Sequence, residues 1–224
     1  MIFHASPLSS YSAKVRIVLC VKAVAHEERA PAQGYRSAGY RAIVPMGTLP
    51  ALQDGDWVLS ESEAINEYLE EACPLPAMLP RDLRLRAQVR FLCRFHDLYL
   101  EPRVRALFAH VRPAQRHAGQ VQALRQEIDH RIAQLDGWAR PAPFLVTPTI
   151  SLADCGPLVT LPLATAVLAA CGQALVLPAG LQKWLDAASS HPAVQQALRP
   201  WRLATDDWLR ATSNLKQPIA ERMP

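Results

Sequence analysis

Three closely spaced prolines, Pro74, Pro76 and Pro80, separate two stretches of different hydrophobic pattern. Before them, short apolar runs alternate with helical periodicity in the order strand–helix–strand, loop, strand–strand–helix. After them, helical periodicity recurs and no strand pattern returns. Closely spaced prolines form a stiff connector, which favours a domain boundary. The pattern therefore predicts a mixed α/β unit over residues 1–77 and an all-helical unit over residues 83–224, packed on each other.

The composition limits the classes of function. The chain has 224 residues, half of them apolar, and a formal net charge of +4. Such a chain buries a substantial core, and so mild a charge gives no reason to expect nucleic acid as a partner. The cysteines form neither a CxxC pair nor a Cys/His metal spacing: they are Cys20, Cys73, Cys93, Cys155 and Cys171. We therefore expect free thiols in a reducing cytoplasm, no metal site and, because the first residues lack a basic start and an apolar core, no signal peptide.

Residues 155–182 carry no charged side chain, so a membrane span has to be considered. Glycines and prolines interrupt this run, namely Gly156, Pro157, Pro162, Gly172, Pro178 and Gly180. A spanning helix needs a longer uninterrupted apolar run. We therefore expect a buried central helix followed by a turn, and no membrane partner.

The expected elements of the first unit are short. They are a strand at 1–5, a helix over 11–22, a weak strand at 26–30, a strand at 48–52 and a strand at 57–59. The last two strands flank the hairpin signal Asp54-Gly55-Asp56. A helix begins at Ser60 or Glu61, and residues 34–42 fit either a short helix or an irregular loop.

The second unit is expected to begin with a long helix over 83–109, kinked near Pro102. Ser151 and Asp154 have the spacing of a capping box at the start of the uncharged helix, with Asp in place of the usual Glu or Gln. Further helices are expected over 121–135, 181–189 and 192–203.

Four segments resemble cytosolic glutathione transferases of the serine type, which include the zeta, theta and tau classes. The segments are 9–16 (SSYSAKVR), 47–52 (GTLPAL), 59–65 (LSESEAI) and 151–154 (SLAD). They occur in the order and spacing of that family and together extend over nearly the whole chain. The resemblance implies a thioredoxin-like first domain, an all-helical second domain, a two-fold homodimer and a cytoplasmic location.

The resemblance also implies a glutathione site in the first domain. Leu49 would pair its backbone N–H and C=O with the cysteinyl unit, as an added strand does, ahead of a cis-proline at Pro50 and beside Thr48. Glu61 would hold the γ-glutamyl ammonium, and Ser62 with the helix amides would hold the γ-glutamyl carboxylate. Without the resemblance, Pro50 fits the start of an edge strand in trans, and Ser60 or Ser62 fits an ordinary N-cap, with acids favoured in the first turn.

Catalysis in this family uses the glutathione thiolate, and a free thiol with a pKa near ~8.5 is little ionised at neutral pH. Ser9 aligns with the family's first serine and is the expected hydroxyl donor to the sulfur. Ser10 is the alternative, because the register of a short loop can slip by one residue. Tyr11 is expected to contact glutathione and ranks below both serines as the donor. An ordinary helix-capping role stays open for each serine.

The chain also departs from the family pattern. No cysteine starts the first helix, which argues against the omega-like and beta-like classes. Met46-Gly47 offers no side chain to hold the glycine carboxylate of glutathione, and Gln33, Tyr40 and Arg41 stay open as substitutes.

The second substrate is expected between Ser9 and the long helix, around Phe95, His96, Tyr99 and Phe108. Aromatic residues at helical spacing are also typical of a core. A lone histidine on a long helix is more often structural than catalytic, so both interpretations of His96 stay open.

The resemblance implies an enzyme that conjugates the thiolate of reduced glutathione to a small hydrophobic electrophile. One alternative is a zeta-like maleyl isomerase. Another is a non-enzymatic regulator similar to the stringent-starvation proteins that bind RNA polymerase, whose first segment also carries Tyr-Ser ahead of a VRIVL run, as Tyr11, Ser12 and residues 15–19 do here. The fold cannot decide among these functions. Ser9 and the Glu61-Ser62 pair favour the enzyme.

Overall fold

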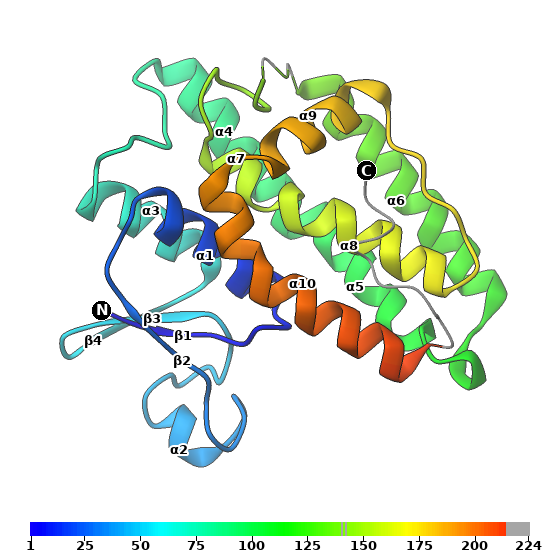
Figure 1. Cartoon of the computed structure of the whole chain (residues 1–224), viewed down its shortest axis with the longest axis horizontal. Coiled ribbons are helices and arrows are strands. Elements are labelled where there is room, and N and C mark those ends of the chain that lie inside the picture. The colour runs from blue at the N-terminus through cyan, green and yellow to red at the C-terminus, as the bar shows by residue number, and fades with distance from the viewer. Residues whose placement is uncertain (140, 142, 214–224) are drawn as a thin grey trace.

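The first domain contains a four-stranded sheet in the order β2–β1–β3–β4 (Figure 1). The strands are β1 (Ile2–His4), β2 (Glu27–Arg29), β3 (Ala51–Asp54) and β4 (Trp57–Ser60). β1 runs parallel to β2 and antiparallel to β3, and β3 runs antiparallel to β4. In the register of the sheet, His4 pairs with Ala51, and Ala51 pairs with Ser60. The segments that follow β1, precede β3 and follow β4 therefore emerge at the same end of the sheet.

Two helices, α1 (Ser10–Val21) and α3 (Ser62–Ala72), pack against each other beside the sheet. A short helix, α2 (Ala38–Arg41), lies between β2 and β3, and the Ser37 hydroxyl caps it by accepting the Tyr40 N–H at 3.2 Å. The helical alternative for residues 34–42 is thus the one observed. The predicted order of strands and helices, and with it the thioredoxin-like class of this domain, is confirmed.

The remaining elements are helical, as predicted. The computed structural model describes residues 1–139, 141 and 143–213, so the end of the predicted helical unit, residues 214–224, lies outside the described part. The longer helices are α4 (Leu83–Phe95), α5 (Glu101–Ala106), α6 (Ala118–Trp138), α8 (Pro157–Ala170), α9 (Ala179–Ser189) and α10 (Pro192–Thr212). Shorter turns are η1 (His96–Leu100), η2 (Leu107–His110), η3 (Pro113–Gln115) and α7 (Leu152–Cys155).

The long helix expected over 83–109 is interrupted before Pro102. Its middle, η1, is a π-helical turn between α4 and α5. Pro102 has no N–H to give to the carbonyl four residues earlier, and a widened turn is one way in which a helix accommodates that loss. The interruption changes which side chains of this stretch share a face.

The uncharged stretch forms the buried centre of the helical domain. Leu152–Ala170 is long and apolar enough to span a membrane, but 89% of its most apolar window is buried inside the molecule. Asp154 and Ser151 form the predicted capping box, with the Ser151 N–H donating to Asp154 Oδ2 at 2.8 Å. The Trp184 Nε1–H also donates to Asp154 at 2.8 Å and ties α9 to this corner. The expected buried central helix is confirmed.

Helix α10 extends to Thr212, well beyond the expected end at residue 203. Its buried positions include Trp201, Thr205 and Leu209, which continue a spacing of four residues. α10 packs across α1, which also contacts α7 and α8 (Figure 1). α1 therefore belongs to the sheet domain in sequence and to both domains in its contacts.

Candidate functional site

The hydroxyl groups of the three candidate residues at the start of α1 have different environments. Ser9 is the N-cap residue of α1, and its Oγ accepts the Ser12 N–H at 3.2 Å. A hydroxyl that accepts a capping bond keeps its own proton for another acceptor. Ser9 is half-buried, so its hydroxyl can both cap the helix and donate to a bound group.

Ser10 is held in a network between the two domains. It is buried, donates to Glu101 Oε1 at 2.9 Å, and accepts from Arg105 Nη2 at 2.8 Å. Arg105 also pairs with the Glu101 carboxylate. Both capacities of the Ser10 hydroxyl are therefore used within the protein.

Tyr11 lies against the same network. The Arg105 guanidinium carbon is 5.2 Å from the centre of its ring. Burial, followed by the charge of Glu101 and a hydrogen bond to it, raises the pKa of the Tyr11 phenol above its ordinary value. A phenol committed to a carboxylate is a weaker candidate for the thiol partner than the Ser9 hydroxyl.

The segment before β3 presents free backbone groups. The Leu49–Pro50 peptide bond is cis, and the N–H and C=O of Leu49 make no hydrogen bond with any described residue. The Thr48 hydroxyl is buried and also lacks a partner among the described residues. The Thr48 carbonyl, by contrast, accepts the Tyr40 hydroxyl at 3.0 Å. Tyr40 thus fixes the loop and leaves the next backbone groups available.

Arg41 lies against the same loop at Gly47. Gly47 has a φ of +59°, and a Cβ at this position would lie 2.9 Å from Arg41 Nε and 3.0 Å from the Tyr35 carbonyl. Glycine is therefore required here both by its backbone conformation and by the close approach of its neighbours. The exposed Arg41 guanidinium makes no hydrogen bond or ion pair with the described residues. The Tyr40 hydroxyl is committed to the Thr48 carbonyl. Among Gln33, Tyr40 and Arg41, the Arg41 guanidinium is thus a cation that lies beside the loop before Leu49 and has no partner in the described part of the chain.

The start of α3 has no side-chain cap. Glu61 is the N-cap residue, with a φ of +75°, and its carboxylate bonds to no helix amide. The backbone N–H groups of residues 62–64 donate to no described residue. Ordinary capping by the Glu61 side chain is therefore not observed. Ser62 is buried at this end, and Glu61 is exposed, so unpaired helix amides, a hydroxyl and a carboxylate lie together.

Lys14, one turn further along α1, is buried in a charged cluster. Its ammonium lies 2.5 Å from Glu63 Oε2 and 2.9 Å from Asp97 Oδ2. Burial disfavours the charged form of Lys14, but the two carboxylates outweigh it and raise its pKa. The same cluster includes His96, whose Nδ1 is 2.8 Å from Asp97 and whose Nε2 is 2.7 Å from Thr160 Oγ1. The ion pairs of Lys14 connect α1, α3 and η1, and the hydrogen bond between His96 and Thr160 connects η1 to α8.

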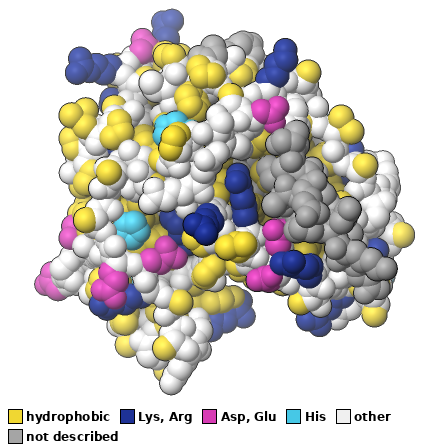
Figure 2. All heavy atoms as spheres, viewed as in Figure 1, with side chains coloured by type: hydrophobic (Ala, Val, Ile, Leu, Met, Phe, Trp, Pro, Cys, Tyr) yellow, Lys and Arg dark blue, Asp and Glu magenta, His cyan; other side chains and the backbone are white. Residues whose placement is uncertain are grey.

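Arg16 has a structural role, because its guanidinium forms two hydrogen bonds with Glu28, at 2.8 and 2.6 Å. Neither Lys14 nor Arg16 has a free charge directed at the start of α1. Lys14 and Arg16 are both buried. Figure 2 shows Lys and Arg side chains near the middle of one face, with Asp and Glu side chains on both sides of them.

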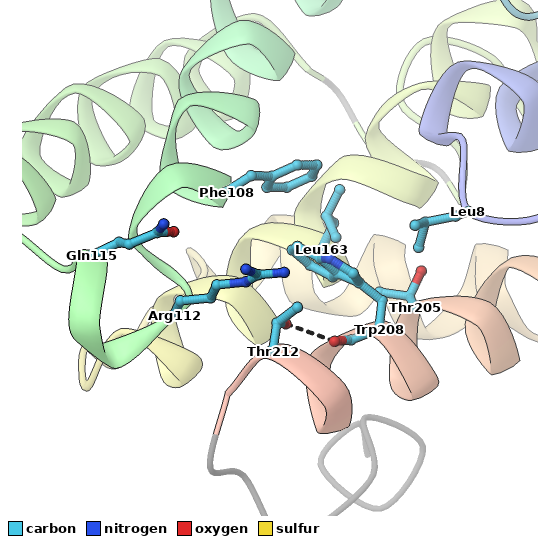
Figure 3. A pocket seen from close by; sticks show the side chains of 8 residues that line it. All are labelled: Leu8, Phe108, Arg112, Gln115, Leu163, Thr205, Trp208 and Thr212. Atoms are coloured by element: carbon cyan, nitrogen blue, oxygen red, sulfur yellow. Dashed lines mark hydrogen bonds between the residues drawn. The ribbon is translucent and has the colours of Figure 1, made fainter. Parts of the chain in front are cut away.

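A cavity of about 300 Å³ opens beside the start of α1. Its lining comes from the segment before α1, from η2 to η3, from α8 and from α10: Leu8, Phe108, Arg112, Gln115, Leu163, Thr205, Trp208 and Thr212. Figure 3 shows Leu8 and Thr205 at one end and Arg112 and Gln115 at the other. The Leu8 end adjoins Ser9 in the chain.

The four residues expected around a second substrate do not lie together. Phe108 lines the cavity. Phe95 is buried, and its ring packs edge-on against Trp138 of α6 and stacks near Tyr99. His96 is in the interior, where a Cβ on Gly156 would approach its ring to 2.6 Å. Phe95, His96 and Tyr99 are therefore not among the residues that line this cavity, and a second-substrate role for them stays a prediction.

Most of the cavity lining was missed from the sequence. Arg112 and Gln115 lie in short turns without periodicity, and Thr205, Trp208 and Thr212 lie in the part of α10 beyond residue 203. The spacing of Thr205, Trp208 and Thr212 by three and four residues was a usable signal for one helix face.

The sheet register, the free strand edge before Pro50 and the helical second domain define the class, which is the glutathione S-transferase fold. The comparisons with known proteins agree. Residues 3–77 match the glutathione S-transferase N-terminal domain family.

Glutathione S-transferase Z1 of Arabidopsis thaliana is 43% identical over 35% of this chain and 37% of its own length. A stringent starvation protein A homolog of Coxiella burnetii is 39% identical over 41% of this chain and 44% of its own length. The chain thus matches less than half the length of these curated relatives.

A solved structure extends the likeness over most of the chain. The maleylacetoacetate isomerase from Anaeromyxobacter dehalogenans, with dicarboxyethyl glutathione and citrate in its active site, is 27% identical, with a TM-score of 0.70 over 88% of this chain and 89% of its own. The predicted resemblance to glutathione transferases is confirmed at the level of fold and first domain.

Proposed function

We propose that this protein is a glutathione transferase that conjugates the thiolate of reduced glutathione to a small electrophile. The observation that carries the proposal is the sheet register, which pairs His4 with Ala51 and Ala51 with Ser60. Because of it, Ser9, Leu49 and the start of α3 emerge at one end of the sheet. These segments carry the free donors and acceptors that an extended, doubly charged tripeptide needs.

Each part of glutathione has a proposed partner in the first domain, residues 1–77. The free N–H and C=O of Leu49, ahead of Pro50, pair with the cysteinyl backbone, as in strand addition. The amides of residues 62–64 and the Ser62 hydroxyl hold the γ-glutamyl carboxylate, since an uncapped helix N-terminus attracts anions. Glu61 holds the γ-glutamyl ammonium.

Further contacts complete this proposed site. Arg41 holds the glycine carboxylate, because its guanidinium is unpaired beside Gly47. The site as proposed also includes the Thr48 hydroxyl, which is buried without a partner among the described residues, and Tyr11, which borders the thiol.

The chemical step is nucleophilic attack by sulfur. The Ser9 hydroxyl donates to the thiolate and lowers the thiol pKa, while the thiol proton passes to solvent. The sulfur forms a C–S bond with the electrophilic carbon, and the leaving group departs with the electron pair of its bond. Ser10 is the second candidate donor. The cavity lined by Leu8 and Phe108, formed mainly by the helical domain, residues 83–224, receives the electrophile; the reaction as proposed uses no metal.

We also propose that the protein is a cytoplasmic homodimer. Apolar side chains stand exposed along α4 and η1, including Phe91, Leu98 and Tyr99 at 45–46% exposure. A second copy would cover this face. Sedimentation equilibrium tests the proposal, and a particle of one chain mass at micromolar concentration would refute it.

The main experiment is calorimetric titration of the full chain with reduced glutathione, followed by a conjugation assay. We expect binding in the micromolar to millimolar range and turnover of a chlorodinitrobenzene. No heat at millimolar glutathione would contradict the proposal and favour the non-enzymatic regulator, for which the similarity to a stringent starvation protein A homolog is the supporting observation. Binding with turnover of a maleyl compound only would favour the isomerase, which the similarity to a maleylacetoacetate isomerase supports.

A further inference from the structure

Arg112 places a positive charge in a cavity whose middle is apolar. The cavity walls beside it include Phe108, Leu163 and Trp208, and Figure 3 shows the guanidinium extending among these side chains. Arg112 forms no ion pair and no side-chain hydrogen bond with any described residue. Arg112 is exposed at this end of the cavity, so the apolar walls on one side strengthen its interaction with an anion only moderately relative to open water.

The neighbouring arginines differ from Arg112. Arg116 donates to the carbonyls of His110, Val111 and Ala170 at 2.7–3.1 Å and so holds the turn in place. Arg105 is committed to Glu101 and Ser10. Arg105 and Arg116 therefore have structural roles. No hydrogen bond or ion pair with a described residue explains why the Arg112 side chain extends into the cavity.

We infer that Arg112 selects second substrates that carry an anionic group, such as a carboxylate or a sulfonate on a flat apolar body. This inference rests on the proposed function and names the substrate class of that site. The guanidinium binds the anion at one end of the cavity, and the Gln115 amide, at the same end, is a further donor. The substrate ring packs against Phe108 and Trp208, whose own ring centroids are 4.9 Å apart, and the reacting carbon then lies at the Leu8 end, next to Ser9.

The catalytic test compares two substrates that differ only in charge. One is a chlorodinitrobenzoate with chlorine para to the carboxylate, and the other is its methyl ester. In both, the glutathione sulfur bonds to the ring carbon and chloride leaves with its electron pair. For Arg112→Gln, we expect kcat/KM for the acid to fall about tenfold, as expected for one charge-assisted contact at a partly exposed site. The ester should change less than twofold.

The matched control is Arg81→Gln, which removes the same charge from the connector before α4, on the opposite side of the molecule from the C-terminal end of α10 (Figure 1). It should leave the acid-to-ester ratio unchanged, and Arg112→Lys should restore part of it. An equal fall for acid and ester in Arg112→Gln, or no fall for either, would leave the acid-to-ester ratio unchanged and would overturn the inference.

A binding measurement separates this inference from the proposed function. Anilinonaphthalene sulfonate, a fluorescent aromatic anion, is displaced by the unreactive dinitrobenzoate that lacks chlorine and by its methyl ester. We expect the wild type to prefer the acid and Arg112→Gln to lose that preference, whether or not the protein conjugates glutathione. If the chain shows the preference but no turnover, the proposed function fails and the anion site stands. If Arg112→Gln keeps the preference, the anion site fails.

Discussion

Replacement of Ser9 by alanine removes two roles of one hydroxyl, and these roles have separate readouts. The first role is the N-cap bond that Ser9 Oγ accepts from the Ser12 N–H at 3.2 Å. Loss of such a cap costs about 1 kcal/mol of stability. The second role is the proposed bond to the glutathione thiolate, and a hydrogen bond to a charged group contributes about 1.5–3 kcal/mol.

The second loss converts into a change in acidity. At about 1.4 kcal/mol per pKa unit, Ser9→Ala should raise the pKa of the bound thiol by one to two units. Below both pKa values, each unit lowers the thiolate fraction tenfold, but a more basic thiolate is intrinsically about threefold more nucleophilic. The conjugation rate at neutral pH should therefore fall by about threefold to tenfold.

The assay is the ultraviolet absorbance of the thiolate in the saturated glutathione complex, titrated against pH, with urea unfolding alongside. Ser9→Thr should keep both roles. Ser9→Asp should keep the cap but raise the thiol pKa further, because it supplies an acceptor and a negative charge but no proton. These two variants separate helix stability from thiol acidity.

Ser10→Ala is the matched control, because the Ser10 hydroxyl is committed to Glu101 and Arg105. It should lower the free energy of unfolding by about 1–2 kcal/mol and leave the thiol pKa unchanged. An unchanged thiol pKa in Ser9→Ala, together with a raised one in Ser10→Ala, would refute the assignment and move the role to Ser10.

Three further perturbations address the rest of the site and its support. Arg41→Gln should weaken glutathione binding about threefold to fivefold by calorimetry, as expected for an exposed ion pair, and leave γ-glutamylcysteine, which lacks the glycine carboxylate, unaffected. Asp97→Asn should lower stability by about 3 kcal/mol at neutral pH, because it leaves a buried ammonium with one partner. Burial would raise the pKa of Asp97, but hydrogen bonds and the nearby cations hold it below its ordinary value. The stability that the Asp97 carboxylate contributes is therefore present above about pH 4 and is lost as the pH falls through the lowered pKa. The free energies of unfolding of the wild type and Asp97→Asn, measured with urea, should converge in acid. Gly156→Ala should cost about 2–3 kcal/mol by thermal unfolding, because its Cβ would lie 2.6 Å from the His96 ring, whereas Gly137→Ala in α6, where a Cβ meets nothing within 4 Å, should not destabilise the protein.

The sequence alone predicted the features that depend on interactions between residues close together in the chain. Ser151 and Asp154 are three residues apart, and that spacing alone brings carboxylate and amide together at a helix start. The bond from Trp184 to the same carboxylate joins positions 30 residues apart, so no local spacing could indicate it. The interruptions of residues 155–182 likewise indicated a buried helix, but not its neighbours.

The cavity could not be predicted in the same way. Periodicity shows which face of a helix is apolar, but not which element covers it. Phe95 and Phe108 were grouped because one long helix, kinked near Pro102, was expected. Phe95 instead ends α4 and packs against Trp138 of α6, and the π-helical turn follows it. Arg112 lies at the start of a three-residue turn, where only the folded chain shows which cavity it enters.

The buried Lys14 limits which domains can be recombined in the evolution of such a chain. Its ammonium is neutralised by Glu63 from the first domain and by Asp97 from the second. A first domain transplanted onto another helical domain would carry a desolvated cation with half of its counter-charge missing. The two domains are therefore distinct in sequence pattern but not independent in stability. Recombination at the proline connector should give a stable protein only when the new helical domain has an acidic residue at the position of Asp97.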